Sequence, residues 1–255
     1  MINVDQAFQK GKALILFITA GDPDLETTED ILCTLAEQGA DLLEIGIPFS
    51  DPVAEGPVIQ RASARALQGG VTTDAIFAMV RRVRARTRVP LAFMTYANVI
   101  VTYGAQRFMA ACEALEVGAV IVPDLPYEEK LELQPACDAH GVALISLIAP
   151  TSEQRIAMIA REAQGFVYCV SSMGVTGVRN RLDANVGEMV RKVKAVRDVP
   201  CAVGFGISTP EQAQTMAQLA DGVIVGSAAV ALIEQYGKDC LEPLAQYVRA
   251  LKRAL

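Results

Sequence analysis

The chain has 255 residues, of which 52% are hydrophobic and 20% charged, and its formal net charge is −6 at pH 7. No apolar run reaches the ~18 residues that a membrane span needs, and the acidic balance opposes nonspecific binding to nucleic acid. The first residues show no basic stretch leading into an apolar one, so a secretory signal is not expected. We therefore expect a cytoplasmic protein with a large buried core that binds neither membranes nor nucleic acid.

The cysteine and histidine usage excludes two classes of site. The single histidine, His140, precedes Gly141 at a predicted helix end, where we expect a capping or surface role. A histidine metal site or a Ser-His-Asp triad is therefore not expected. The cysteines are widely spaced and show no C-x-x-C pair, which favours buried free thiols in a reducing compartment. They are Cys33, Cys112, Cys137, Cys169, Cys201 and Cys240.

Short apolar runs recur along the chain, each followed by a Gly, Pro or polar break and a helix-like stretch. The runs are nearly continuous in Val, Ile, Leu and Ala, which is typical of strands covered on both faces, as in a parallel sheet under helices. The predicted strands are Ala13–Thr19, Asp41–Gly46, Leu91–Thr95, Ala119–Val122, Ala143–Ile148, Phe166–Val170, Cys201–Phe205 and Gly222–Val225.

Helix signals fit between these strands. Capping residues and prolines predict helices over Leu25–Gln38, Thr73–Arg86, Tyr127–Ala139 and Pro210–Ala220. Strands alternating with helices, without a linker-like stretch, predict an α/β protein whose residues 1–255 form a single (β/α)₈ TIM barrel domain. A doubly wound open sheet is the alternative, and it is disfavoured because no G-x-G-x-x-G follows the first strand.

In such a barrel the functional site lies at the C-terminal ends of the strands. The apolar run 40–47 carries one carboxylate, Glu44, and a Pro/Gly-rich loop with Asp51 and Glu55 follows at once. A lone ionised acid in a dry strand is costly unless it is paired or its pKa shifts, and proteins keep such a group mainly where its proton is used. A structural pair with a buried arginine is the alternative, but no arginine stands at a predicted strand end. We expect Glu44 to be catalytic.

Glycines follow the last two predicted strands, in Gly204-Phe205-Gly206 and in Gly226-Ser227. Both suit a phosphate, because glycine lets the backbone approach closely and a helix N-terminus presents free N–H groups. The long polar segment Ser171–Arg179 is predicted to act as a lid. No lysine stands at the C-terminal end of a predicted strand, so a Schiff-base aldolase mechanism has no obvious nucleophile.

At these residues the chain resembles the tryptophan synthase α subunits, which cleave indole-3-glycerol phosphate to indole and glyceraldehyde 3-phosphate. Residues 43–52, LEIGIPFSDP, with GPVIQ at 56–60, are similar to the signature around the catalytic acid of that family. The matching motifs run in the expected order from near residue 13 to near residue 230. The further matches are FITAGDP at 17–23, YAN at 96–98, GVTG at 174–177, GFGI at 204–207 and GS at 226–227.

The resemblance implies a role for each matching residue. Glu44 would be the principal acid/base. The second carboxylate, usually an aspartate, falls at Glu55, a departure that moves the carboxyl group ~1.5 Å further from the backbone. Phe17, Ile59, Tyr96, Tyr168 and Phe205 would wall an indole pocket, Gly177, Gly206, Gly226 and Ser227 would hold the phosphate, Thr176 would close with the lid, and Asp124 would help to hold the loop region.

The resemblance also implies an α₂β₂ complex with a β subunit that carries pyridoxal phosphate, facing loops 52–57 and 98–102. Neither a metal nor an organic cofactor is expected in this chain. Three alternatives remain: a stand-alone indole-3-glycerol-phosphate lyase, a weakly catalytic or non-catalytic subunit that mainly activates its β partner, and a metal-dependent sugar-phosphate epimerase or aldolase. The last would use Glu44, Asp51 and Asp124 as ligands.

Overall fold

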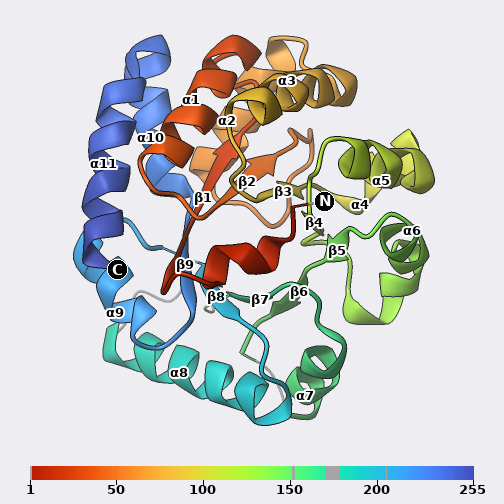
Figure 1. Ribbon diagram of the computed structural model, residues 1–255, viewed down its shortest axis with the longest axis vertical. Helices are drawn as coiled ribbons and strands as arrows, with labels where there is room; N and C mark the ends of the chain where they lie inside the picture. Colours follow the sequence, from red (N-terminus) through yellow and green to blue (C-terminus); the bar gives the residue numbers. More distant parts are fainter. Residues whose placement is uncertain (1, 151–152, 171–178, 205) are drawn as a thin grey trace.

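The computed structural model describes residues 2–150, 153–170, 179–204 and 206–255, with helices arranged around a central sheet (Figure 1). Every strand pair in this sheet is parallel, and the strand order is β5-β4-β3-β2-β1-β9-β8-β7-β6. Within the same residues, no helix is both long and apolar enough to cross a membrane.

The strand order closes the sheet. β5 and β6 are two pieces of one chain path, separated only at Ile145, and they pair with β4 and β7 respectively. The predicted (β/α)₈ barrel is therefore confirmed, and the doubly wound sheet, whose strand order would reverse at a switch point, is wrong. The strands are β1 Ala13–Thr19, β2 Leu42–Gly46, β3 Leu91–Met94, β4 Ala119–Ile121, β5 Ala143–Leu144, β6 Ser146–Ile148, β7 Val167–Val170, β8 Cys201–Gly204 and β9 Gly222–Val225.

Side chains alternate between the barrel interior and the layer under the helices. On β2, Leu42 belongs to the interior cluster, whereas Leu43 and Ile45 pack outside. Both faces of the strand are buried, as its continuous apolar run predicts. The same alternation places Glu44 on the interior side, one step nearer than Leu42 to the C-terminal end of the barrel.

Two predicted helix starts have the expected caps. Asp24 accepts a hydrogen bond from the Thr27 N–H, and Thr209 forms a capping box with Gln212. The single helix predicted over Tyr127–Ala139 is wrong, because Pro135 has no N–H group and the chain forms a 3₁₀ turn, η2, followed by a new helix. The helices are α1 Leu25–Glu37, α2 Pro57–Gln68, α3 Thr73–Arg86, α4 Ala97–Tyr103, α5 Ala105–Ala114, α6 Gln134–Ala139, α7 Glu153–Glu162, α8 Arg179–Val196, α9 Pro210–Ala217, α10 Ser227–Tyr236 and α11 Leu241–Ala254, with 3₁₀ turns η1 Val4–Phe8, η2 Tyr127–Glu132 and η3 Gly237–Asp239.

The N-terminal 3₁₀ turn η1 lies across one end of the barrel (Figure 1). Its Val4 and Ala7 belong to the interior cluster, and the Phe8 ring lies 5.5 Å from that of Phe166, between centroids. Since Phe166 directly precedes β7, this is the end at which the strands begin. The interior is thus covered at that end, and the site is to be sought at the opposite one.

Candidate active site

A cavity of about 470 Å³ lies at the C-terminal end of the barrel, beside the first turns of α2 and α10. It brings together residues that the sequence had singled out from distant segments: Phe17, Glu55, Ile59, Tyr168, Gly206, Gly226 and Ser227. Their shared location is a geometric finding, whereas their chemical roles stay predictions. The rest of the lining consists of Ala54, Gly56, Met94, Ile207, Ser208, Ile224 and Ala228.

Glu44 lies beside this cavity and not in its lining. In the sheet register it stands opposite Phe17 of β1 and Ala92 of β3. Its side chain is 0% exposed, and neither carboxylate oxygen has a hydrogen-bond partner among the described residues. Burial raises the pKa of Glu44 from its usual value of 4.5 to about 8. The alternative of a structural pair with a buried arginine therefore finds no support in the described part of the chain.

Tyr168 connects Glu44 to the cavity. Its ring lines the cavity, and its pKa is raised first by burial and then by the nearby charge of Glu44. The ring fits because β8 has Gly204 beside it: a Cβ atom there would lie 2.5 Å from the Tyr168 hydroxyl oxygen. Likewise a Cβ atom at Gly46 would lie 2.6 Å from the Phe17 ring. These two glycines make room for the aromatic side chains around Glu44.

Glu55 lies in the loop between β2 and α2, where it is half-buried. Its Oε2 is buried and has no hydrogen-bond partner in the described structure, and burial raises its pKa to about 7. Tyr96 supports this loop, since its hydroxyl accepts a hydrogen bond of 3.0 Å from the Ala54 N–H and its ring stacks on Phe49. Tyr96 does not line the cavity, so the structure places it behind the loop that carries Glu55.

The remaining predicted residues fall in two groups. Asp124 lies outside the cavity lining, and its Oδ1 accepts a hydrogen bond of 2.9 Å from the Ala97 N–H, the first of α4. It therefore holds α4 next to Tyr96 instead of capping the helix that follows it. The second group, Thr176, Gly177 and Phe205, lies outside the described residues, as does most of the predicted lid, residues 171–178.

The cavity has two chemically different parts. Phe17, Met94 and Ile224 give it an apolar wall, while Gly226, Ser227 and Ala228 bring in the N-terminus of α10. Gly226, the N-cap of that helix, makes no side-chain cap hydrogen bond. The first N–H groups of the helix and its dipole therefore favour an anion at this end.

Sequence reasoning missed several lining residues, among them Met94 and Ile224. Strand alternation could have found them. Met94 stands two residues after the interior Ala92 of β3, and Ile224 stands two residues after Gly222 of β9, so both face the barrel interior. The metal-dependent alternative gains no support: in the described ranges no three His, Cys, Asp or Glu side chains are grouped to hold a metal ion.

The buried carboxyl of Glu44 predicts a pH-dependent stability. In the folded protein the Glu44 carboxyl group keeps its proton up to about pH 8, whereas in the unfolded chain it loses that proton near pH 4.5. Folding therefore takes up a proton between these pH values. The free energy of unfolding should therefore fall as pH rises from 5 to 8, by up to about 1.4 kcal/mol per pH unit from this group. In urea unfolding at a series of pH values, Glu44→Gln should lose this slope. The exposed Glu132→Gln should keep it, and equal slopes in wild type and Glu44→Gln would contradict the assignment.

The chain was compared with known proteins. Residues 4–255 match the family model described as tryptophan synthase alpha chain. The chain is 48% identical over 256 residues to the tryptophan synthase alpha chain of Lactiplantibacillus plantarum, covering 100% of this chain and 97% of that one. It is 50% identical over 246 residues to that of Geobacter sp. strain M21, covering 96% and 92%.

Solved structures agree with the sequence relatives. The tryptophan synthase subunit alpha of Legionella pneumophila superimposes with a TM-score of 0.90 at 36% identity, over 100% of this chain and 98% of that one. A chain of the tryptophan synthase α₂β₂ complex of Pyrococcus furiosus does so with a TM-score of 0.89 at 36% identity, over 96% and 99%. The resemblance seen in the motifs is thereby confirmed, and the chain belongs to the tryptophan synthase alpha chain family.

Proposed function

We propose that this chain is a lyase of tryptophan biosynthesis that cleaves indole-3-glycerol phosphate into indole and glyceraldehyde 3-phosphate, with Glu44 as the acid/base. The observation that carries the proposal is a fully buried carboxyl group without a hydrogen-bond partner in the described structure, beside a cavity with an apolar wall and a helix N-terminus. An isolated acid in a barrel interior destabilises the fold, and a catalytic role explains why it is kept.

The two parts of the cavity suit the two ends of this substrate. An indole-sized ring buries roughly 150–250 Å², which at ~25 cal/mol/Å² contributes at most about 4–6 kcal/mol. Backbone hydrogen bonds to a phosphate, at ~1.5–3 kcal/mol each, reach a comparable sum with three or four donors. Phe17 and Ile59 would contact the ring, and Gly226 with Ser227 would bind the phosphate. Two anchors of similar strength fix the scissile C–C bond between them.

The raised pKa of Glu44 sets the order of the proton transfers. At neutral pH this carboxyl group is protonated, so it can deliver its proton to the ring carbon that bears the glycerol chain. The positive charge then spreads onto the ring nitrogen. The ionised Glu44 then takes the proton of the glycerol hydroxyl next to the ring. The bond between the ring carbon and the carbon that bears this hydroxyl breaks, and the electron pair of that bond neutralises the charge on the ring. The products are indole and the aldehyde, and Glu44 is protonated again.

Glu55 is the group that we propose for the ring nitrogen. With a pKa of about 7 it is partly ionised at neutral pH, so its carboxylate can accept a hydrogen bond from the ring N–H as positive charge develops there. Glu44 itself lies beside the cavity, next to Phe17 and Tyr168 of its lining. Its side chain must therefore turn toward the cavity when the substrate binds.

Replacing Glu44 with glutamine tests the central role. Glu44→Gln should lower kcat for indole release by about 10²–10⁴, the usual contribution of a positioned acid/base, because the amide cannot exchange the proton. Binding of glycerol 3-phosphate, an unreactive analogue of the substrate tail, should stay within about twofold of wild type, since the phosphate end is untouched. Stopped assays of indole with the purified protein measure the first, and inhibition constants the second. Unchanged turnover would falsify the role.

Two variants of Glu55 test whether this loop has adapted to glutamate. Glu55→Gln removes the charge and should lower kcat by about 10²-fold. Glu55→Asp keeps the charge but withdraws the carboxyl group by ~1.5 Å, and a misplacement of ~1 Å can cost about 10²-fold, so it should also be slower than wild type. Steady-state kinetics with indole-3-glycerol phosphate measure both. An aspartate variant faster than wild type would mean that the loop is not set for glutamate.

We also propose that this chain works as the α subunit of an α₂β₂ complex, the assembly named for the Pyrococcus furiosus structure. Two large apolar side chains stand exposed in the two segments expected to face the β subunit: Val53, at 82% in the loop after β2, and Val101, at 61% on α4, a helix where a loop was expected. Pyridoxal phosphate would belong to that partner. Glu44 of this chain makes both proton transfers, so we propose no metal or organic cofactor here. The six buried free cysteines of the chain fit a cytoplasmic location.

Adding the β subunit distinguishes the remaining alternatives. Turnover by the purified chain should be slow and should rise at least tenfold with the β subunit, whereas a stand-alone lyase would be fast alone. A non-catalytic activator would release no indole in either state. Val53→Asp with Val101→Asp should weaken this activation by about tenfold or more without changing the basal rate, because two charges would be buried in the interface. Val196→Asp, at an exposed site at the end of α8 and on the opposite side of the barrel from these segments, is the matched control. Full activation of the double variant would place the partner elsewhere.

A further inference from the structure

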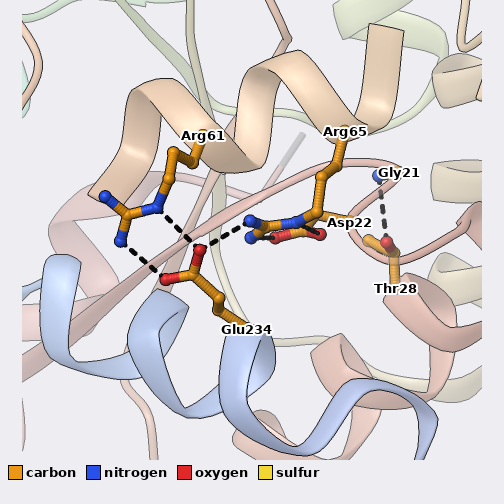
Figure 2. A network of polar contacts seen from close by, with 6 residues as sticks. All are labelled: Gly21, Asp22, Thr28, Arg61, Arg65 and Glu234. Atoms are coloured by element: carbon orange, nitrogen blue, oxygen red, sulfur yellow. Dashed lines mark hydrogen bonds and ion pairs between the residues drawn. The ribbon is translucent and has the colours of Figure 1, made fainter. Parts of the chain in front are cut away.

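Four charged side chains form a continuous chain of contacts between α2, α10 and the loop after β1 (Figure 2). The Arg61 guanidinium donates to both oxygens of Glu234, at 2.7 and 2.8 Å. Arg65 also donates to Glu234, at 2.8 Å, and makes two bonds of 2.8 Å to Asp22. Cations and anions therefore alternate from Arg61 through Glu234 and Arg65 to Asp22.

The loop end of this network is rigidly held. The Asp22 side chain is only 2% exposed, and the preceding Gly21 donates its N–H to the Thr28 hydroxyl at 3.0 Å. That hydroxyl donates in turn to the Asp24 carbonyl at 2.7 Å, at the start of α1. Asp22 is therefore a fixed point, and Arg65 ties α2 to it.

The same two helices carry opposite ends of the candidate site. α2 begins at Pro57, two residues after Glu55, and α10 begins at the proposed phosphate-binding residues Gly226 and Ser227. Beneath the network, Ala62 of α2 and Val230 of α10 pack in one cluster with Phe17. Arg61 adjoins Ala62, and Glu234 stands one turn after Val230, so the ionic contacts continue the same seam.

We propose that Glu234, bridging Arg61 and Arg65, is a positioning residue that fixes α2 against α10 and thereby holds Glu55 at its distance from the phosphate-binding end of the cavity. This inference rests on the proposed function. The first turn of α2 is tied to Glu55 directly, because the Gln60 side-chain amide donates a hydrogen bond of 2.8 Å to the Glu55 carbonyl oxygen. Since α2 begins two residues after Glu55, at Pro57, a shift of the helix would move that carboxyl group.

The geometry distinguishes this network from ordinary surface ion pairs. Isolated exposed pairs stabilise a fold little, but paired two-bond arginine contacts fix orientation as well as distance. Glu234 is 30% exposed and Arg65 33%, so both are partly shielded from water. Arg61 and Arg65 stand one helical turn apart on α2, and holding both prevents this helix from rotating about its own axis as well as sliding along it.

Glu234→Gln removes the central charge with almost no change in size. We expect kcat for indole release to fall about tenfold, because Glu55 is displaced relative to the bound substrate, while KM and inhibition by glycerol 3-phosphate change less than twofold. Arg61→Met, which breaks only the outer contact, should act in the same direction but less. Hydrogen–deuterium exchange of residues 47–56 should rise several-fold in Glu234→Gln. This measurement does not depend on catalytic activity.

Glu29→Gln is the matched control, because Glu29 of α1 also bridges two arginines, Arg82 and Arg86 of α3, away from the cavity. It should leave kcat and the exchange of residues 47–56 within twofold of wild type. Equal exchange of this segment in wild type and Glu234→Gln, or a kcat loss that only follows the folded fraction measured by circular dichroism, would overturn the positioning role. Absence of indole release from wild type would refute the proposed function instead, and the exchange result would still decide this inference.

Discussion

The desolvation of one carboxyl group, Glu44, is the constraint on which the rest of this structure depends. Its neighbours in the sheet, Phe17 and Ala92, offer no hydrogen bond, so burial alone keeps its proton in place at neutral pH. Water would remove that effect, but Glu44 is 0% exposed, and Val4 and Ala7 of η1 pack into the barrel interior at the end opposite the cavity. The fold therefore supplies both the position of the acid and its protonation state, which an exposed glutamate could not keep.

The second acid, Glu55, differs from Glu44 in how it is held. Glu44 belongs to a strand whose neighbours fix it on both sides, whereas Glu55 belongs to a loop and depends on contacts made by other elements. Tyr96 holds this loop from one side, and α2 continues it on the other. Precision at a loop residue thus requires several independent supports, and we expect mutations in those supports to change the proposed chemistry without touching the cavity.

Much of this could be predicted from sequence, for definite reasons. Continuous apolar strands and capped helices reveal a barrel because they follow from local chemistry, and Glu44 is conspicuous because it interrupts such a strand. The helix break at Pro135 follows from a rule that was available but outweighed by the helix-start signals at the beginning of that stretch, Pro126 and the acids that follow it. The place of Tyr96 behind the loop, and the bridge from Glu234 to Arg61, depend on side-chain packing between segments far apart in the chain. Such contacts cannot be predicted from the spacing of residues along the sequence.

The two interior glycines have a consequence for redesign of this barrel. Gly46 and Gly204 each leave the volume that a neighbouring ring fills, so each belongs with its aromatic partner, Phe17 or Tyr168, as a volume-matched couple. Substituting only the glycine or only the aromatic residue of a couple would mostly create a steric clash or an unfilled cavity. Exchanging both members together, with a larger residue opposite a smaller one, is the route to reshaping the chamber for a bulkier or slimmer heterocycle.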